Sequence, residues 1–315
     1  MLLHPINIAF CVNDKYIKYI TVTIKSIIEN ENEDVYIHVL TDHISNKSRE
    51  NLLNVIEGYD NISLHIYEVD DTLLRTLKTD YWTIYTWYRL LIPQVLPNTI
   101  ERVLYLDADT LVTSNLHELF SIDMRNKSIA ASLDVQSLDK LTFDRCGYDM
   151  SLKYICAGVL LINLDYWRKY YLSEQIFNWA KLNHDRIKFP DQDAINYLCK
   201  DTKIILPMRY GILNAYFTNE SFYNKDYVEQ LNDCINHPSI IHYAACPPWI
   251  KERAKHIMQG EWVRINKMMP KPVKCFYESK GIVFIKVFIW RLLYSFKRND
   301  KNRILENIRQ KLLKI

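Results

Sequence analysis

The stretch "RVLYLDADTLVTSN", residues 102–115, decides the fold. Apolar residues 103–106 run directly into two aspartates one residue apart, Asp107 and Asp109, and the apolar pattern resumes at Leu111. A short apolar run of this kind is typical of a buried strand. Carboxylates rarely lie beside a core unless something pairs with them. The stretch therefore predicts a buried strand that ends at two carboxylates, and these carboxylates are expected to bind a partner.

Strand patterns alternate with helix patterns on the N-terminal side of this stretch. Strands are predicted at 6–12, 35–42, 61–69 and 102–109, and helices over the segment with Ile20, Ile24, Ile27 and Ile28 on one face, at 45–57 and at 86–96. This alternation predicts an α/β fold with a mostly parallel, twisted sheet and helices on both faces. Ligands of such sheets bind beyond the carboxyl ends of the strands. Asn13, Asp42 and Asp107 would all lie on that edge.

The second half is less regular. We expect a strand and turn at 157–167, a helix at 173–183, a helix beginning at Pro190, a strand running into a proline-rich loop over 239–249, and a linker at 266–274. These segments divide the chain into a main domain, 1–265, and a C-terminal segment, 266–315, that consists of a linker and basic amphipathic helices.

Composition places the chain among ordinary globular proteins, with 49% hydrophobic and 24% charged residues. The seven cysteines are odd in number and scattered without a C-x-x-C pair. This argues against a disulfide framework or a zinc knuckle and favours reduced thiols. The N-terminus lacks the basic region of a signal peptide. We therefore expect a cytoplasmic protein.

Charge is distributed unevenly along the chain. From Lys286 onward nine Lys or Arg face only Asp300 and Glu306, a net charge of +7, which leaves −4 for the rest of a chain whose total is +3. The apolar segment 281–296 is shorter and more charged than the roughly 20 apolar residues that span a bilayer. An amphipathic basic helix would lie on the anionic inner face of the plasma membrane, whereas the alternative is a helix packed on the body. No feature suggests a nucleic-acid partner.

Three roles are open for the aspartate pair. Two carboxylates can bind a hard cation such as Mg²⁺ or Mn²⁺, or they can cap a turn. "DADT" also fits a phosphatase-type loop, in which the first aspartate is the nucleophile. That loop normally opens its domain and needs a downstream lysine and a further acidic pair on another strand. Here three strand–helix units precede it, and Asp191 and Asp193 follow a proline at a helix start.

"PDQD", residues 190–193, places two aspartates in a first helical turn, where capping alone explains them. Capping does not need Gln192, whose amide offers donors and an acceptor. His242 ends a predicted strand; a lone histidine is more often structural than a ligand. It would become a ligand only if the fold brings it to the aspartate pair.

Together these residues resemble family 8 of the retaining glycosyltransferases, over about residues 6–250. The resemblance rests on six motifs in the family's order: "INIAFCVNDKYIKYITVTIKSI", "YRL", "RVLYLDADTLV", "AGVLLINLDYW", "PDQDAIN" and "IHY…PPW". It implies a GT-A fold and metal-dependent transfer of a hexose, glucose or galactose, from a UDP-sugar with retention of configuration. The implied acceptor is a glycan or glycolipid of the cell surface, such as a lipopolysaccharide or capsule precursor.

The resemblance also implies roles for single residues. Asp107, Asp109 and His242 match the ligands of a Mn²⁺ ion, with Mg²⁺ as the alternative. Asp191 matches the carboxylate on the donor sugar and Gln192 the glutamine at the anomeric carbon, the two catalytic positions. The remaining donor-binding positions, besides Asp107 and Asp109, are Cys11, Asn13, Tyr16, Arg89, Ala108 and Lys251. Because an amide is a poor nucleophile, we expect front-face attack rather than a covalent intermediate.

The sequence departs from the family at the donor site. Asn13 replaces an aspartate that contacts uracil, and Cys156 replaces the asparagine of an "NAG" motif. The family's "HYxGxxKPW" is shortened to "HYAACPPW", so its glycine is replaced by Ala245 or lost, and the lysine that clamps the diphosphate is absent. Lys251 could take its place. These departures leave a second hypothesis, an inactive member that binds sugar nucleotides as a scaffold.

Overall fold

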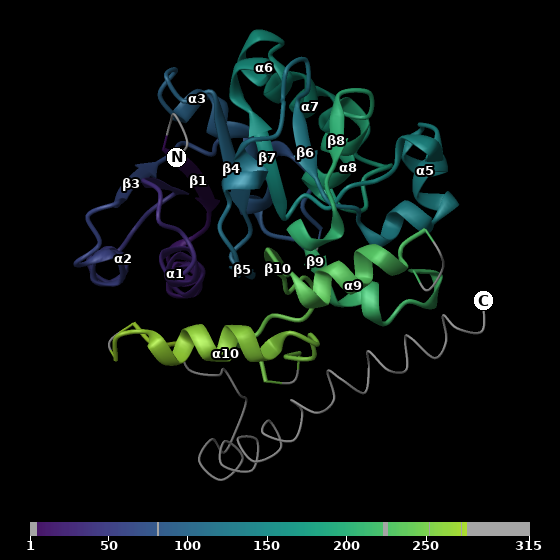
Figure 1. The fold of residues 1–315 in the computed structure, drawn as a ribbon. Helices are drawn as coiled ribbons and strands as arrows, with labels where there is room; N and C mark the ends of the chain where they lie inside the picture. The colour runs from purple at the N-terminus through teal and green to yellow at the C-terminus, as the bar shows by residue number, and fades with distance from the viewer. Residues whose placement is uncertain (1–4, 81, 223–225, 252, 272, 276–315) are drawn as a thin grey trace.

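The protein is described from a computed structural model, which covers residues 5–80, 82–222, 226–251, 253–271 and 273–275. A mixed sheet of seven strands forms its centre (Figure 1), in the order β3-β2-β1-β4-β7-β6-β8. The strands are β1 Ile6–Cys11, β2 Val35–Thr41, β3 Ile62–Glu68, β4 Arg102–Leu106, β6 Ile129–Ala131, β7 Val159–Asn163 and β8 Lys203–Ile205. Only β7 runs against its neighbours β4 and β6, so the sheet is mostly parallel, as predicted.

The sheet buries both faces because side chains alternate along each strand. On β1, Ile6, Ile8 and Phe10 enter one apolar cluster, whereas Ala9 and Cys11 enter a second cluster on the opposite face. This alternation with apolar residues on both sides is typical of a sheet covered twice.

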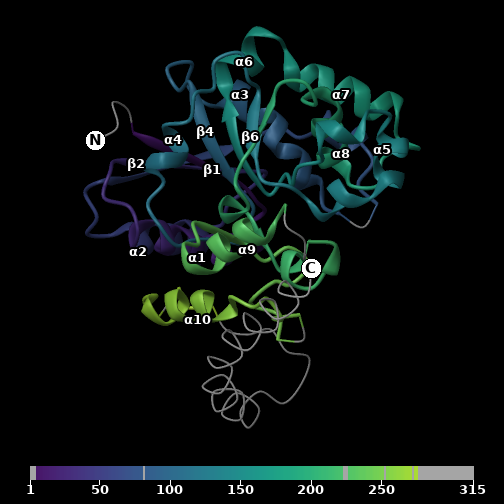
Figure 2. The same ribbon diagram turned by 45° about the vertical axis from the view of Figure 1, so that its right-hand side comes forward.

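Helices from different parts of the chain cover the two faces (Figures 1 and 2). The first cluster receives side chains from α1 Asp14–Ile28, α2 Asn46–Ile56, α9 Val228–Asn236 and α10 Gln259–Met268. The second receives them from α3 Ile92–Val95, α6 Leu164–Lys169, α7 Leu172–Leu182 and α8 Pro190–Leu198. Two short helices, α4 His117–Phe120 and α5 Lys140–Cys146, lie between strands. Among the described residues, no helix combines the length and apolar character needed to cross a membrane.

A second, three-stranded sheet joins the middle of the chain to its C-terminal part. Its order is β5-β10-β9, with β5 Thr110–Val112, β10 Ile240–His242 and β9 Ile212–Leu213. β10 pairs antiparallel with β5, and this register sets His242 opposite Thr110. The residue that follows the aspartate pair is thereby fixed beside the predicted metal-binding histidine.

Three predicted segments differ in the structure. The predicted helix 86–96 is mostly a 3₁₀ helix, Ile84–Leu91, which ends in the short α3. The predicted turn after β7 is helix α6, whose first turn is capped by Asn163. The predicted linker 266–274 continues α10 to Met268, because Trp262 and Ile265 of this helix are buried in the first cluster.

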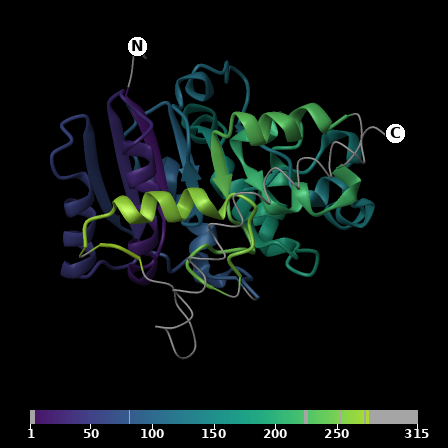
Figure 3. The same cartoon turned by 60° about the horizontal axis from the view of Figure 1, so that its bottom comes forward.

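The end of the predicted linker is also packed. Val273 and Cys275 are buried in the first cluster, and α10 lies against α1 (Figure 3). The division of the chain at residue 265 therefore remains a prediction, and the described residues 266–271 and 273–275 of the C-terminal segment pack with the body. The basic segment from Lys286 onward lies outside the described residues.

Candidate active site

The aspartate pair occupies the turn between β4 and β5. The Asp107 N–H donates to the Gly158 carbonyl at 2.8 Å, which ties the turn to the start of β7. The Tyr243 N–H donates to the Asp109 carbonyl at 2.8 Å, which extends the β5–β10 pairing past His242. These two backbone contacts bring three side chains together that are far apart in the sequence.

Asp107, Asp109 and His242 form a cluster able to hold a metal ion. Their nearest ligand atoms lie within 4.8 Å of one another. His242 Nε2 lies 3.3 Å from Asp109 Oδ1 and 3.7 Å from Asp107 Oδ2. Burial alone would lower the pKa of His242, but the Cys156 thiol and the Asp109 carboxylate raise it well above its usual value. The site thus favours positive charge, and a divalent cation would compete with a proton for Nε2.

Gly158 keeps the centre of this cluster open. A Cβ atom at this position would lie 2.1 Å from His242 Cε1 and 2.7 Å from both Asp107 Oδ2 and His242 Nε2. Any side chain at residue 158 would therefore fill the space between the ligands. Two carboxylates and one imidazole around an open space form a donor set that suits Mn²⁺ or Mg²⁺.

Arg89 joins the metal-site aspartate to the helix that carries "PDQD". Its guanidinium is buried, with Nη2 3.1 Å from Asp107 Oδ1 and Nε 3.1 Å from Asp191 Oδ2. The guanidinium carbon lies 4.2 Å above the centre of the Tyr105 ring, and Nη1 donates to the Ala157 carbonyl. Burial opposes the charge, but the two carboxylates more than compensate and raise the pKa of Arg89.

Asp191 carries a buried oxygen that lacks a well-aligned donor. Its Oδ2 faces Arg89 Nε, yet the N–H of that atom points to the Thr86 carbonyl at 2.9 Å. Burial raises the pKa of Asp191 to about 6, Arg89 opposes the rise, and Asp107 adds to it. A buried oxygen without a hydrogen bond is costly, so this atom is suited to accept one from a ligand hydroxyl.

Gln192 is held at both ends of its amide. Oε1 accepts the Ala157 N–H at 2.8 Å, and Nε2 donates to the Tyr154 hydroxyl at 3.4 Å. Burial raises the pKa of Asp134, and a hydrogen bond from the Gln192 side chain opposes that rise. The amide oxygen is thus occupied by a backbone donor and does not project freely as a nucleophile.

These groups line one cavity of about 300 Å³. Its polar walls carry the predicted residues Arg89, Asp107, Asp109, Asp191, Gln192 and His242, together with Cys156 and the unpredicted Asp134 and Asn214. Its apolar walls include Trp82 and Phe189, also unpredicted. Asp134 follows β6, which runs parallel to β4, so its position at the same sheet edge was foreseeable had this short strand been identified.

Five predicted donor-binding residues stand apart from the cavity lining. Cys11 is buried at the end of β1, and Ala108 packs against the first cluster. Asn13 caps α1, accepting the Tyr16 N–H at 3.1 Å, and the Tyr16 ring is 40% exposed. Lys251 is half-buried beyond Trp249. Their role toward a nucleotide remains a prediction.

The shortened loop after β10 forms one wall of the cavity through Ala244 and Ala245. Ala245 has a φ of 61°, in the left-handed region that favours glycine. The loop ends at Trp249, whose ring stacks on Tyr19 of α1 with the ring centres 3.9 Å apart. The loop therefore holds Ala245 in a backbone conformation that favours glycine.

An α/β fold of this strand order, with an acidic pair and a histidine beyond the carboxyl end of β4, is the arrangement that the resemblance to GT-A glycosyltransferases implies. The chain belongs to glycosyl transferase family 8, and the sequence model of this family matches residues 7–252. A lipopolysaccharide 1,2-glucosyltransferase of Escherichia coli is 27% identical over 250 residues, 77% of this chain and 73% of that protein. A "Putative glycosyltransferase" of Haemophilus influenzae is 28% identical over 259 residues, 80% and 74% of the two chains.

A solved structure has the same fold. The galactosyltransferase LgtC, in complex with donor and acceptor sugar analogs, superimposes with a TM-score of 0.74 at 24% identity. The match covers 84% of this chain and 96% of LgtC. The resemblance to family 8 and the GT-A fold expected from the sequence are thereby confirmed.

Proposed function

We propose that this chain transfers a hexose, glucose or galactose, from a UDP-sugar to a cell-surface glycan or glycolipid, with retention of configuration. The observation that carries the proposal is the opening of the Asp107–Asp109–His242 cluster into the same cavity as Asp191 and Gln192. The names of the relatives, which include lipopolysaccharide glucosyl- and galactosyltransferases, favour these two hexoses and this acceptor class.

Asp107, Asp109 and His242 would hold Mn²⁺, or Mg²⁺ as the alternative. The ion would supply Lewis-acid stabilisation of the charge on a departing diphosphate. Arg89 fixes Asp107 on one side and Asp191 on the other, so the metal site and the sugar-binding carboxylate keep a constant separation. The Asp191 oxygen without an aligned donor would accept a hydroxyl of the donor sugar.

Retention would follow from attack on the same face as the leaving group. A double displacement needs a nucleophile free to reach the anomeric carbon. Gln192 Oε1 already accepts the Ala157 N–H, and an amide is in any case a weak nucleophile. Gln192 would instead face the positive charge that develops on the sugar ring and stabilise it through its dipole.

Nucleotide binding would involve the residues that lie outside the cavity lining. Asn13 stands at the N-terminus of α1, where its side chain already caps the helix. Cys11, Tyr16, Ala108 and Lys251 are the further candidates. Lys251 would take the place of the diphosphate-clamping lysine that "HYAACPPW" lacks.

A panel of UDP-sugars, each with Mn²⁺, tests the function through the release of UDP. We expect release from UDP-glucose or UDP-galactose by the wild-type chain and none by Asp109→Ala. Asp123→Ala, which removes an exposed aspartate of an ion pair that does not line this cavity, is the matched control. If the wild-type chain releases no UDP with any UDP-sugar and acceptor, the result would favour the hypothesis of an inactive member that acts as a scaffold.

Phosphate release from a phosphomonoester would favour the phosphatase hypothesis. The geometry speaks against it, because no lysine is among the described residues that line the cavity. Asp193 of the supposed acidic pair is bound by Arg145 instead of facing Asp107.

We further propose that the basic segment from Lys286 onward attaches the enzyme peripherally to the anionic inner face of the plasma membrane. Sequence supports this: the segment combines a net charge of +7 with Trp and Phe side chains. The full chain should sediment with anionic vesicles, and a chain ending at residue 281 should not. Equal sedimentation of both chains would refute the attachment.

A further inference from the structure

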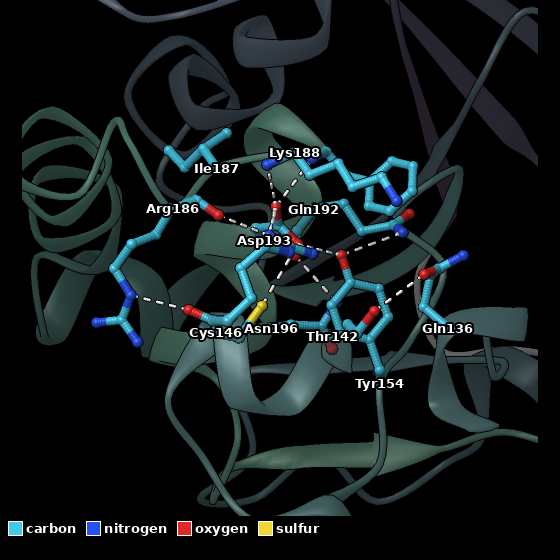
Figure 4. Close-up of polar contacts among 12 residues, drawn as sticks. Gln136, Thr142, Cys146, Tyr154, Arg186, Ile187, Lys188, Gln192, Asp193 and Asn196 are labelled. Carbon is cyan, nitrogen blue, oxygen red and sulfur yellow. Dashed lines mark hydrogen bonds and ion pairs between the residues drawn. The ribbon is translucent and has the colours of Figure 1, made fainter. Parts of the chain in front are cut away.

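A buried carboxylate, Asp193, follows Gln192 in helix α8 and lies at the centre of a group of polar contacts (Figure 4). Asp193 is fully buried, and its oxygens accept the Tyr154 hydroxyl at 2.6 Å and the backbone N–H groups of Lys188 and Phe189 at 2.8 Å each. The Arg145 guanidinium forms a two-pronged ion pair with it. Every one of these partners is a donor, so Asp193 acts only as an acceptor.

This arrangement fixes the direction of the next hydrogen bond. Because Asp193 only accepts, the single proton of the Tyr154 hydroxyl points to Asp193. The lone pairs of that hydroxyl are left for Gln192, whose Nε2 lies 3.4 Å away and can only donate. The charge on Asp193 therefore favours the NH₂ end of the Gln192 amide on the Tyr154 side, in the same sense as the hydrogen bond from the Gln192 side chain to Asp134.

The opposite end of the amide meets a complementary group. Gln192 Oε1 accepts the Ala157 N–H at 2.8 Å, and the Ala157 carbonyl accepts from Arg89. An amide turned by 180° would set NH₂ against the Ala157 N–H and a carbonyl against the lone pairs of Tyr154. Both contacts would then be repulsive, so only one orientation satisfies the pair.

We propose that Tyr154 and Asp193 are positioning residues that fix the orientation of the Gln192 amide in the donor cavity. The inference rests on the proposed function, because it concerns the residue assigned to the anomeric carbon. Asp193 and Tyr154 are absent from the cavity lining and fully buried. They act through Gln192, and Asp193 cannot itself reach a substrate as a nucleophile.

The test is Tyr154→Phe, which removes one hydroxyl and keeps the ring. Tyr88→Phe is the matched control, because the Tyr88 hydroxyl donates to Asp71 at 2.6 Å in an equally buried pair that does not line the cavity. Loss of orientation at a reacting group lowers turnover by up to about a hundredfold. We expect kcat for UDP release to fall at least tenfold in Tyr154→Phe, with KM for the donor and Mn²⁺ affinity within about twofold of wild type. Tyr88→Phe should keep the wild-type kcat.

A crystal structure of Tyr154→Phe gives a readout that does not need activity. The Gln192 NH₂ then keeps Asp134 as an acceptor but loses Tyr154, and we expect Gln192 Oε1 to leave the Ala157 N–H. If wild type releases no UDP, the proposed function fails and this structure alone decides the inference. Unchanged kcat in an active enzyme, or Gln192 still bonded to Ala157 in the variant, would overturn it. Equal losses in both variants would show a merely structural role.

Discussion

Gly158→Ala tests the proposed metal site without removing any of its ligands, because the added methyl group fills the space between them. The added methyl carbon would lie 2.1 Å from His242 Cε1, whereas unstrained carbon atoms approach to about 3.5 Å. The imidazole must therefore retreat by more than about 1 Å, and metal–ligand distances tolerate only about 0.2 Å. His242 can then no longer bind the ion.

The expected loss of Mn²⁺ affinity is at least about a hundredfold, or about 2.7 kcal/mol, the upper end of what an outer-shell change costs. The assay is calorimetric titration of Mn²⁺ into the full chain saturated with UDP, with circular dichroism to confirm folding. Gly211→Ala is the control, because its Cβ would meet only Ser132, at 3.1 Å from Oγ, away from the ligands. Affinity of Gly158→Ala within threefold of wild type would refute the reasoning.

Three further predictions concern stability. Ala245→Gly should raise the free energy of unfolding by about 0.5 kcal/mol in urea titrations, because relief of the left-handed backbone, about 1 kcal/mol or more, exceeds the added unfolded-state entropy; a destabilised variant would contradict this. His38 is buried against Asn7, and burial lowers its pKa from 6.5 to about 4, so the unfolded chain alone takes up this proton as pH falls. The free energy of unfolding should fall by up to about 3 kcal/mol between pH 6.5 and 4 on this account, and urea titrations of His38→Gln should show a shallower fall; equal slopes would exclude His38 as the cause. Asp193→Ala leaves Arg145 without its carboxylate and should cost about 3 kcal/mol in thermal or urea unfolding, and a loss below 1 kcal/mol would mean that solvent replaces the pair.

The elements that could be predicted are those with a strong local pattern. Apolar runs ending in polar residues identified β1 to β4, and a one-sided row of isoleucines identified α1, whose buried residues include Ile20, Ile24 and Ile27. The aspartate pair at the end of β4 followed from the same pattern. These signals are contained within a few residues, so no tertiary information was needed.

The elements that were missed depend on distant partners. The segment 266–274 has the prolines and lysines of a linker, yet α10 persists to Met268 because its apolar face packs on α1. β6 has three residues, too few to show the alternation of a strand, so Asp134, three residues after its end, was not predicted. Asp193 fitted a helix cap, and only the fold brings Arg145 to it across 48 positions.

The loop after β10 is fastened at two points that do not depend on its interior. His242 and Tyr243 are held by the strand pairing and by the Asp109 carbonyl, and Trp249 is held by its stack on Tyr19. The side chains of the intervening residues, 244–248, can therefore change while His242 stays in place. Because Ala244 and Ala245 of this segment line the cavity, exchanging it between homologues would change that wall without moving the paired strands.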